Sequence, residues 1–147
     1  MIKTQYDCNY FTKFSDEQVK SAIKQDPGNA FITINSQTST SRKYIALKDI
    51  HANVELKTTF ASKMLENYVS SFDATVVRLL REHDYNIVGH TNLDEFAMGS
   101  TNLTSFFGGV DNAYSPEYGA GGSSGGSAYA VARGLVPIAT GTDTGGS

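Results

Sequence analysis

Two segments in the first ninety residues have the pattern of surface helices. Residues 15–25, "SDEQVKSAIKQ", begin with Ser15 and carry Gln18 three residues later, which is typical of a capping box. Residues 73–83, "DATVVRLLREH", begin with Asp73, which we predict to be the N-cap. Their apolar residues at helical spacing are Val76, Val77 and Leu80.

Short apolar runs between these segments and after them are typical of strands. They are residues 30–35 ("AFITIN"), 44–49 ("YIALKD"), 85–92 ("YNIVGHTN", ending in a turn) and 136–140 ("VPIAT"). Residues 127–135, "SAYAVARGL", predict a third helix, which Gly134 would cap at its C-terminus. Strands that alternate with helices favour an α/β fold with a β-sheet core flanked by helices.

The composition divides the chain into two unlike parts. Of the 14 glycines, 12 fall at or after Gly99, and four charged residues follow residue 98. We interpret the last third as glycine-rich loops inside a larger folding unit, so we expect one domain that is incomplete in these 147 residues.

Charge and cysteine content exclude several classes of function. The net charge of −3 gives no reason to expect tight nucleic-acid binding by this segment, because a phosphate partner favours a basic surface. Cys8 is the single cysteine, which excludes an intrachain disulfide and a multi-cysteine metal site. No apolar stretch is long enough to span a bilayer, so we expect a soluble, intracellular protein.

The segment with the most candidate chemistry is 119–134, "GAGGSSGGSAYAVARG". A Walker loop needs Lys after its last Gly, whereas Gly126 is followed by serine, and the dinucleotide pattern lacks its third Gly. The nucleophile-elbow pattern G-x-S-x-G fits Ser123 and Ser124, but it needs a downstream histidine, and the last one is His90. A Gly/Ser turn before a helix is the structural alternative.

Two further places in the chain change this picture. Lys48 ends an apolar strand, and a buried lysine loses its charge readily, which makes it a competent base. The segment 141–147, "GTDTGGS", places Ser147 in a glycine-rich turn whose backbone N–H groups can converge on an oxyanion.

Together, "ALKD" and "GGSSGGSAYAVARGLVPIATGTDTGGS" resemble the amidase signature family, hydrolases with a Ser–Ser–Lys triad. Ser123 follows Lys48 by 75 residues (123 − 48), and Ser147 follows Ser123 by 24 (147 − 123), as in the family pattern. The resemblance covers at least residues 44–147. In the related pattern G-x-P-x-x-x-K-D, Arg42 and Tyr44 stand where the family has Gly and Pro.

The resemblance implies a role for each motif residue. Ser147 would be the nucleophile, Ser123, after a cis peptide bond, would bridge it to the base, and neutral Lys48 would be that base. The implied oxyanion donors are the N–H groups of Thr144, Gly145 and Gly146. The implied wall of the substrate pocket is Met98, Gly99 and Ser100. No metal site is implied.

Within the family, "GHTNLDEFAMGSTNLTSFFGG" and "TTFASKMLENY" are most similar to the glutamine-hydrolysing subunits of tRNA-dependent amidotransferases. That similarity implies a heterotrimer with amidotransferase subunits B and C, glutamine as substrate, and Glu-tRNA(Gln) served through the complex. It implies that this chain holds no cofactor and that the partner subunit uses ATP and Mg²⁺. It implies no membrane partner. The expected location is the cytoplasm or an organellar matrix.

Two alternatives stay open: a stand-alone amidase acting on small amides, and an inactive truncated fragment that keeps an interaction surface. Family chains are roughly three times as long, beyond the usual single-domain length. We therefore expect residues 1–147 to be the N-terminal portion of one amidase domain, inactive alone, with a helical region at about 1–28 and the amidase core at 29–147.

The remaining polar residues of the motifs receive structural roles. We expect a surface or turn position for the three histidines, which share no metal spacing: His51, His83 and His90. We expect loop hydrogen bonds and a helix cap from Ser124 and Ser127, and turn or helix-start hydrogen bonds from Asp94 and Glu95.

Overall fold

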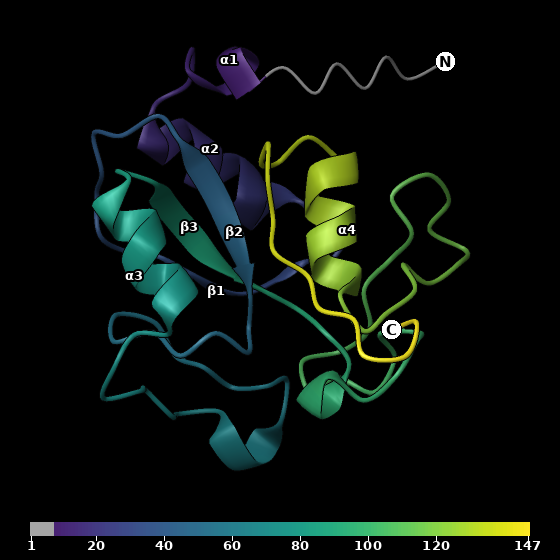
Figure 1. Cartoon of the computed structure of the whole chain (residues 1–147). Helices are drawn as coiled ribbons and strands as arrows, with labels where there is room; N and C mark the ends of the chain where they lie inside the picture. Colours follow the sequence, from purple (N-terminus) through teal and green to yellow (C-terminus); the bar gives the residue numbers. More distant parts are fainter. Residues whose placement is uncertain (1–7) are drawn as a thin grey trace.

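The computed structural model describes residues 8–147, in which a small sheet lies between helices (Figure 1). The helices are α1 (Cys8–Phe11), α2 (Asp16–Gln25), α3 (Thr75–Glu82) and α4 (Gly125–Ala132), with 3₁₀ turns at Lys63–Leu65 and Glu95–Ala97. The strands are β1 (Phe31–Ile34), β2 (Tyr44–Lys48) and β3 (Asn86–Thr91). The predicted α/β fold is confirmed. The predicted domain division at residue 28 stays a prediction, and its first seven residues lie outside the described part.

Within residues 8–147 the sheet has the order β1–β3–β2, with β3 antiparallel to β1 and parallel to β2. A bulge interrupts the second pairing: Ile45 pairs with Ile87, but Ala46 pairs with Gly89. The extra residue, Val88, shifts the alternation of side chains along β3. As a result, His90 shares a face of the sheet with Leu47.

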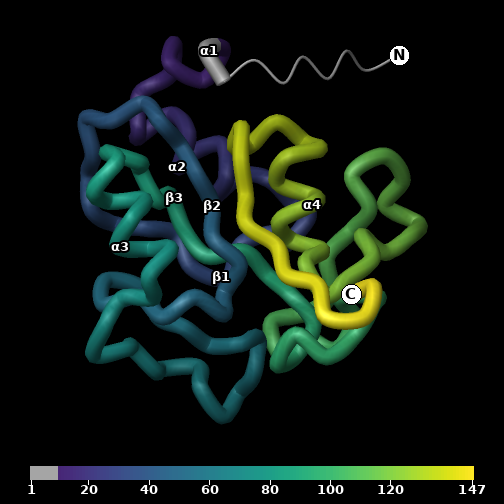
Figure 2. The backbone as a smooth tube through the Cα atoms, viewed as in Figure 1, coloured from purple at the N-terminus to yellow at the C-terminus, as the bar shows by residue number. Residues whose placement is uncertain are grey.

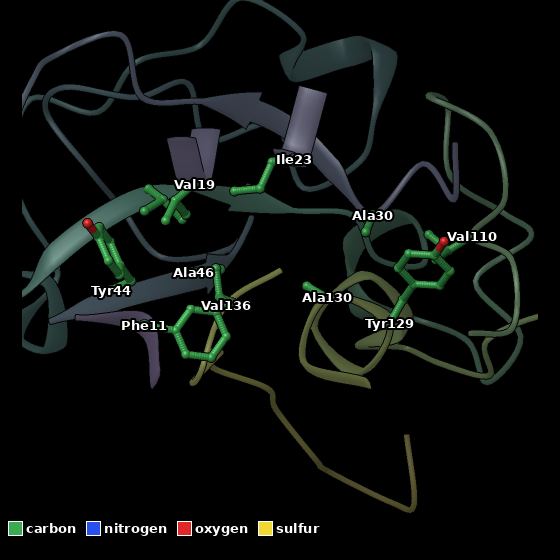
Figure 3. Packing of buried hydrophobic residues seen from close by; sticks show 11 residues of the cluster. Phe11, Val19, Ile23, Ala30, Tyr44, Ala46, Val110, Tyr129, Ala130 and Val136 are labelled. Atoms are coloured by element: carbon green, nitrogen blue, oxygen red, sulfur yellow. The ribbon is translucent and has the colours of Figure 1, made fainter. Parts of the chain in front are cut away.

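Apolar residues on the two faces of the sheet form two cores. The first lies between the sheet, α2 and α4, where Ile23, Ala46 and Ala130 are buried (Figure 3). The second joins the other face to α3 through Leu47 and Val77, both fully buried. β2 therefore has a helix against each face, and all five of its residues are buried.

The helix ends test the predicted caps. Ser15 and Gln18 form the predicted capping box, with bonds of 3.1 Å from Gln18 N to Ser15 Oγ and 2.8 Å from Ser15 N to Gln18 Oε1. The prediction that Asp73 caps α3 is wrong, because Ala74 is the N-cap. The Asp73 carboxylate accepts from Val54 N at 2.9 Å instead, a tertiary donor that the local pattern does not contain.

The last third of the chain also departs from the prediction in places. α4 begins at Gly125, two residues before the predicted start, and Gly134 has the positive φ of +68° expected of a C-terminal cap. The predicted strand at 136–140 is wrong: Ala139 forms an isolated parallel bridge with Ala46. Figure 2 shows this segment running beside β2. Pro137 lacks an N–H, which limits a longer ladder.

Gly126 gives a testable prediction for stability. A Cβ at this position would lie 2.5 Å from both Ala30 O and Asn92 O, and both atoms belong to the backbone. Gly126→Ala is therefore expected to lower the free energy of unfolding by about 3 kcal/mol, despite the better helix propensity of alanine. Thermal or denaturant unfolding measures it. Gly145→Ala, where a Cβ meets nothing within 4 Å, is the matched control. Equal stability of the two variants would contradict the packing.

Candidate active site

Lys48 lies at the end of β2 with its side chain fully buried. It leaves the sheet on the α4 face, and its Nζ lies within hydrogen-bond distance of three hydroxyls. The distances are 2.7 Å to Ser123 Oγ, 2.9 Å to Ser124 Oγ and 2.6 Å to Thr142 Oγ1. The sequence predicted the partnership with Ser123. It gave no role to Thr142, whose one signal is its place in "GTDTGGS".

Burial lowers the pKa of Lys48, while the negative charge of Asp94 acts in the opposite direction. Desolvation is the larger of the two causes because water cannot stabilise the ammonium in this position. A neutral amine has two N–H donors and one lone pair. Two of the surrounding hydroxyls can accept from it while the third donates to it, so this environment suits an uncharged Lys48.

Ser123 connects Lys48 to Ser147. Its side chain is fully buried, and its Oγ lies 3.3 Å from Ser147 Oγ. The Gly122–Ser123 peptide bond is cis, as the family resemblance implied. The structure thus brings Lys48, Ser123 and Ser147 together in the predicted order.

Asp94 organises the loop that holds Ser123. Its backbone N donates to Ser123 O at 3.1 Å, and its buried carboxylate accepts from Asn102 N at 2.9 Å and Thr104 Oγ1 at 2.8 Å. A Cβ at Gly122 would clash with this carboxylate, so glycine is required there. The predicted turn role of Asp94 is confirmed, and Glu95 starts a 3₁₀ turn.

The predicted substrate wall begins against this same carboxylate. A Cβ at Gly99 would lie 2.5 Å from Asp94 Cγ, so the chain at residues 98–100 passes directly over Asp94. Met98 projects its side chain to solvent, with 77% exposed. The wall is therefore adjacent to the Ser123 loop, and its contact with substrate stays a prediction.

The predicted oxyanion donors lie in the exposed turn before Ser147. Gly146 N donates to Asp143 Oδ1 at 2.6 Å, and Gly146 has a positive φ of +94°. One of the three N–H groups is thus held by a carboxylate, while Thr144 and Gly145 are exposed. A substrate oxyanion would have to replace Asp143 at Gly146 N.

Among the structural roles assigned to polar residues, those of His90 and Ser127 need correction, and that of Ser124 is confirmed. The predicted surface or turn position of His90 is wrong, since it is fully buried in β3. Ser127 lies inside α4 rather than capping it, and its Oγ is 2.6 Å from Thr91 Oγ1. Ser124 makes the expected loop hydrogen bond by accepting from Thr142 N at 3.2 Å.

Comparison with known proteins now adds a family. The model of the amidase family matches residues 44–147, which contain all three triad candidates. This chain belongs to the amidase family.

Within residues 8–147, no helix has the length and apolar character that a membrane span requires.

Individual members of the amidase family are similar over most of the chain. The A subunit of the glutamyl-tRNA(Gln) amidotransferase of Coxiella burnetii is 47% identical over 139 residues, covering 95% of this chain and 28% of that protein. The crystal structure of the corresponding Thermotoga maritima protein matches with a TM-score of 0.79 and 38% identity, covering 90% of this chain and 33% of that one. Kluyveromyces lactis allophanate hydrolase matches with a TM-score of 0.76 and 30% identity, covering 95% and 27%. The chain therefore spans about a third or less of the length of these relatives.

Proposed function

We propose that this chain carries the Ser–Ser–Lys catalytic residues of the glutamine-hydrolysing subunit of a tRNA-dependent amidotransferase. The observation that carries the proposal is the chain of contacts from buried Lys48 Nζ to Ser123 Oγ and on to Ser147 Oγ. Further support comes from the 47% identity to the Coxiella burnetii amidotransferase protein over nearly the whole chain.

In the first half of the reaction, Ser147 Oγ attacks the side-chain carbonyl carbon of glutamine. Its proton passes to Ser123 Oγ as the Ser123 proton passes to the lone pair of neutral Lys48. The negative charge develops on the carbonyl oxygen, where the N–H groups of Thr144, Gly145 and Gly146 would stabilise it. The tetrahedral intermediate then expels the nitrogen, which takes the proton back from Lys48 through Ser123 and leaves as ammonia.

In the second half, water attacks the Ser147 ester. Ser123 and Lys48 take the proton of the water and return it to Ser147 Oγ. This step releases glutamate and restores the starting state. Residues 98–100 would line one wall of the glutamine pocket, because Asp94 ties this stretch to the Ser123 loop.

The ammonia would pass to a partner that amidates Glu-tRNA(Gln). In this proposal subunits B and C complete a heterotrimer, and ATP and Mg²⁺ serve the partner rather than this chain. The net charge of −3 agrees with this division, since a basic surface for tRNA would then be supplied by the partners.

The test is to produce the complete protein together with its partner subunits and to measure ammonia release from glutamine and amidation of Glu-tRNA(Gln). We expect both activities, with amidation dependent on ATP. Hydrolysis of simple amides by an isolated monomer, without amidation in the complex, would favour the stand-alone amidase instead. A complete protein that hydrolyses neither glutamine nor simple amides would reject both the amidotransferase function and the stand-alone amidase function.

A further inference from the structure

A buried polar chain lies behind Lys48, on the opposite face of the sheet. It consists of Asp49, His90 and Asn53, whose side chains are all fully buried. His90 Nδ1 is 2.8 Å from Asp49 Oδ1 and 2.8 Å from Lys57 O. The Val88 bulge in β3 is what turns His90 towards this face, beside Leu47.

The surroundings of His90 fix its tautomer. Both groups at Nδ1 are acceptors, so Nδ1 must carry the proton. At the other ring nitrogen, Nε2 faces Asn53 Nδ2 at 3.5 Å. The Asn53 amide is oriented by its oxygen, which accepts from Glu55 N and from an Arg81 guanidinium N, both at 2.9 Å. Asn53 Nδ2 therefore points a donor at Nε2, and the hydrogen-bond partners of the ring assign the Nδ1–H tautomer to His90.

Asp49 is held by side chain and backbone together. Its carboxylate accepts from Thr59 N at 3.0 Å and from Thr59 Oγ1, in addition to His90. Its backbone N donates to Thr91 O, and its backbone O accepts from Phe60 N, each at 3.1 Å. Because Asp49 directly follows Lys48, this anchoring fixes the end of β2 from which the lysine departs.

We propose that His90 is a positioning residue for Lys48: by holding the Asp49 carboxylate through Nδ1–H, it sets the strand end that aims Nζ at Ser123. The proposal rests on the proposed function, in which Lys48 is the base. Without the Nδ1–H donor, a fully buried carboxylate would lose a partner and the turn after β2 would rearrange. A displacement of about 1 Å at a catalytic group can cost about 100-fold in rate.

Substitutions at His90 in the complete protein with its partners test the proposal. Asparagine can place a donor where Nδ1–H lies, whereas leucine cannot. We expect His90→Leu to lower kcat for glutamine by about 30-fold or more with KM changed less than about threefold. His90→Asn is expected to recover kcat to within about threefold of wild type. His83→Leu, at the C-terminal cap of α3 and remote from Lys48, is the matched control and should leave kcat unchanged.

Two results would overturn the positioning role: wild-type kcat in His90→Leu, or equal losses of kcat in His90→Leu and His90→Asn. The rate should also be followed against pH, because a displaced Lys48 would lose part of the burial that lowers its pKa. In the pH–rate profile, we expect the rise that reports Lys48 to shift along the pH axis in His90→Leu and to return to its wild-type position in His90→Asn. A merely structural role would be indicated by two observations together. The rise of the rate with pH would be unchanged in both variants, and kcat would fall only as far as the melting temperature falls.

A measurement independent of activity separates this inference from the proposed function. ¹⁵N-histidine labelling of the complete protein, with His90→Asn used to assign its signals, reports which ring nitrogen is protonated. We expect the proton on Nδ1, where the two acceptors lie. An Nε2–H tautomer would refute the positioning role whatever the activity, because Nδ1 would then have no proton to donate to Asp49. Full activity in a Lys48 variant would instead reject the proposed function and leave the tautomer result intact.

Discussion

Exchanging Lys48 for arginine is expected to lower kcat for amide hydrolysis by about 10⁴-fold. Arginine does not lose its proton at working pH, so it places a fixed cation where the neutral amine acts and cannot take the proton of Ser147. Nζ lies among the hydroxyls of Ser123, Ser124 and Thr142, which accept hydrogen bonds from a cation as well as from an amine. The polar partners of residue 48 are thus retained while the base is removed.

The measurement is steady-state ammonia release by the complete protein with its partners. Lys43→Arg, an exposed lysine just before β2, is the matched control and should retain wild-type kcat. Ser147→Ala gives the floor of the assay, because it removes the nucleophile. Retention of more than about a tenth of kcat in Lys48→Arg would contradict the assignment of Lys48 as the base.

The pH dependence of wild type follows from the same residue. Burial lowers the pKa of Lys48 below its usual value of 10.5, so the neutral base appears as pH rises through this lowered pKa. Activity should rise over that range and then level off. The unfolded state still binds the Lys48 proton between the lowered pKa and 10.5, so stability should also rise with pH in that window. Lys48→Arg should lose both rises.

The candidate site could be predicted from sequence because its residues lie at the end of an apolar strand and in glycine-rich turns with fixed spacing. Lys48 ends an apolar strand. Ser123 follows Gly122, where a Cβ would lie 2.1 Å from Asp94 Oδ2, and Ser147 follows Gly146, which has a positive φ of +94°. Such constraints are local and leave a pattern in the chain. The capping box at Ser15 could be predicted for the same reason.

The features that escaped prediction depend on tertiary partners. The position of His90 follows from one extra residue in β3, and strict alternation cannot show which face a strand side chain takes after a bulge. Asp73 has the right type for a helix cap, but the backbone N–H of Val54 competes for its carboxylate. The run at 136–140 has strand composition, yet it meets β2 at a single bridge.

A matched pair of serines tests the proton path directly. Ser123 and Ser124 both place Oγ close to Lys48 Nζ, at 2.7 Å and 2.9 Å. The hydrogen bond to Ser147 Oγ is made by Ser123, at 3.3 Å, while Ser124 accepts from the backbone of Thr142. Ser123→Ala is therefore expected to lower kcat by about 10³-fold, and Ser124→Ala by less than about tenfold.

The double variant Ser123→Ala/Ser147→Ala distinguishes a relay from two separate contributions. If Ser123 acts only by carrying the proton of Ser147, removing it from a protein that already lacks the nucleophile should cost nothing further. Independent roles would instead multiply the two losses. Equal losses in Ser123→Ala and Ser124→Ala would point to a general effect on the environment of Lys48, and the proton would then have to reach Nζ without passing through Ser123.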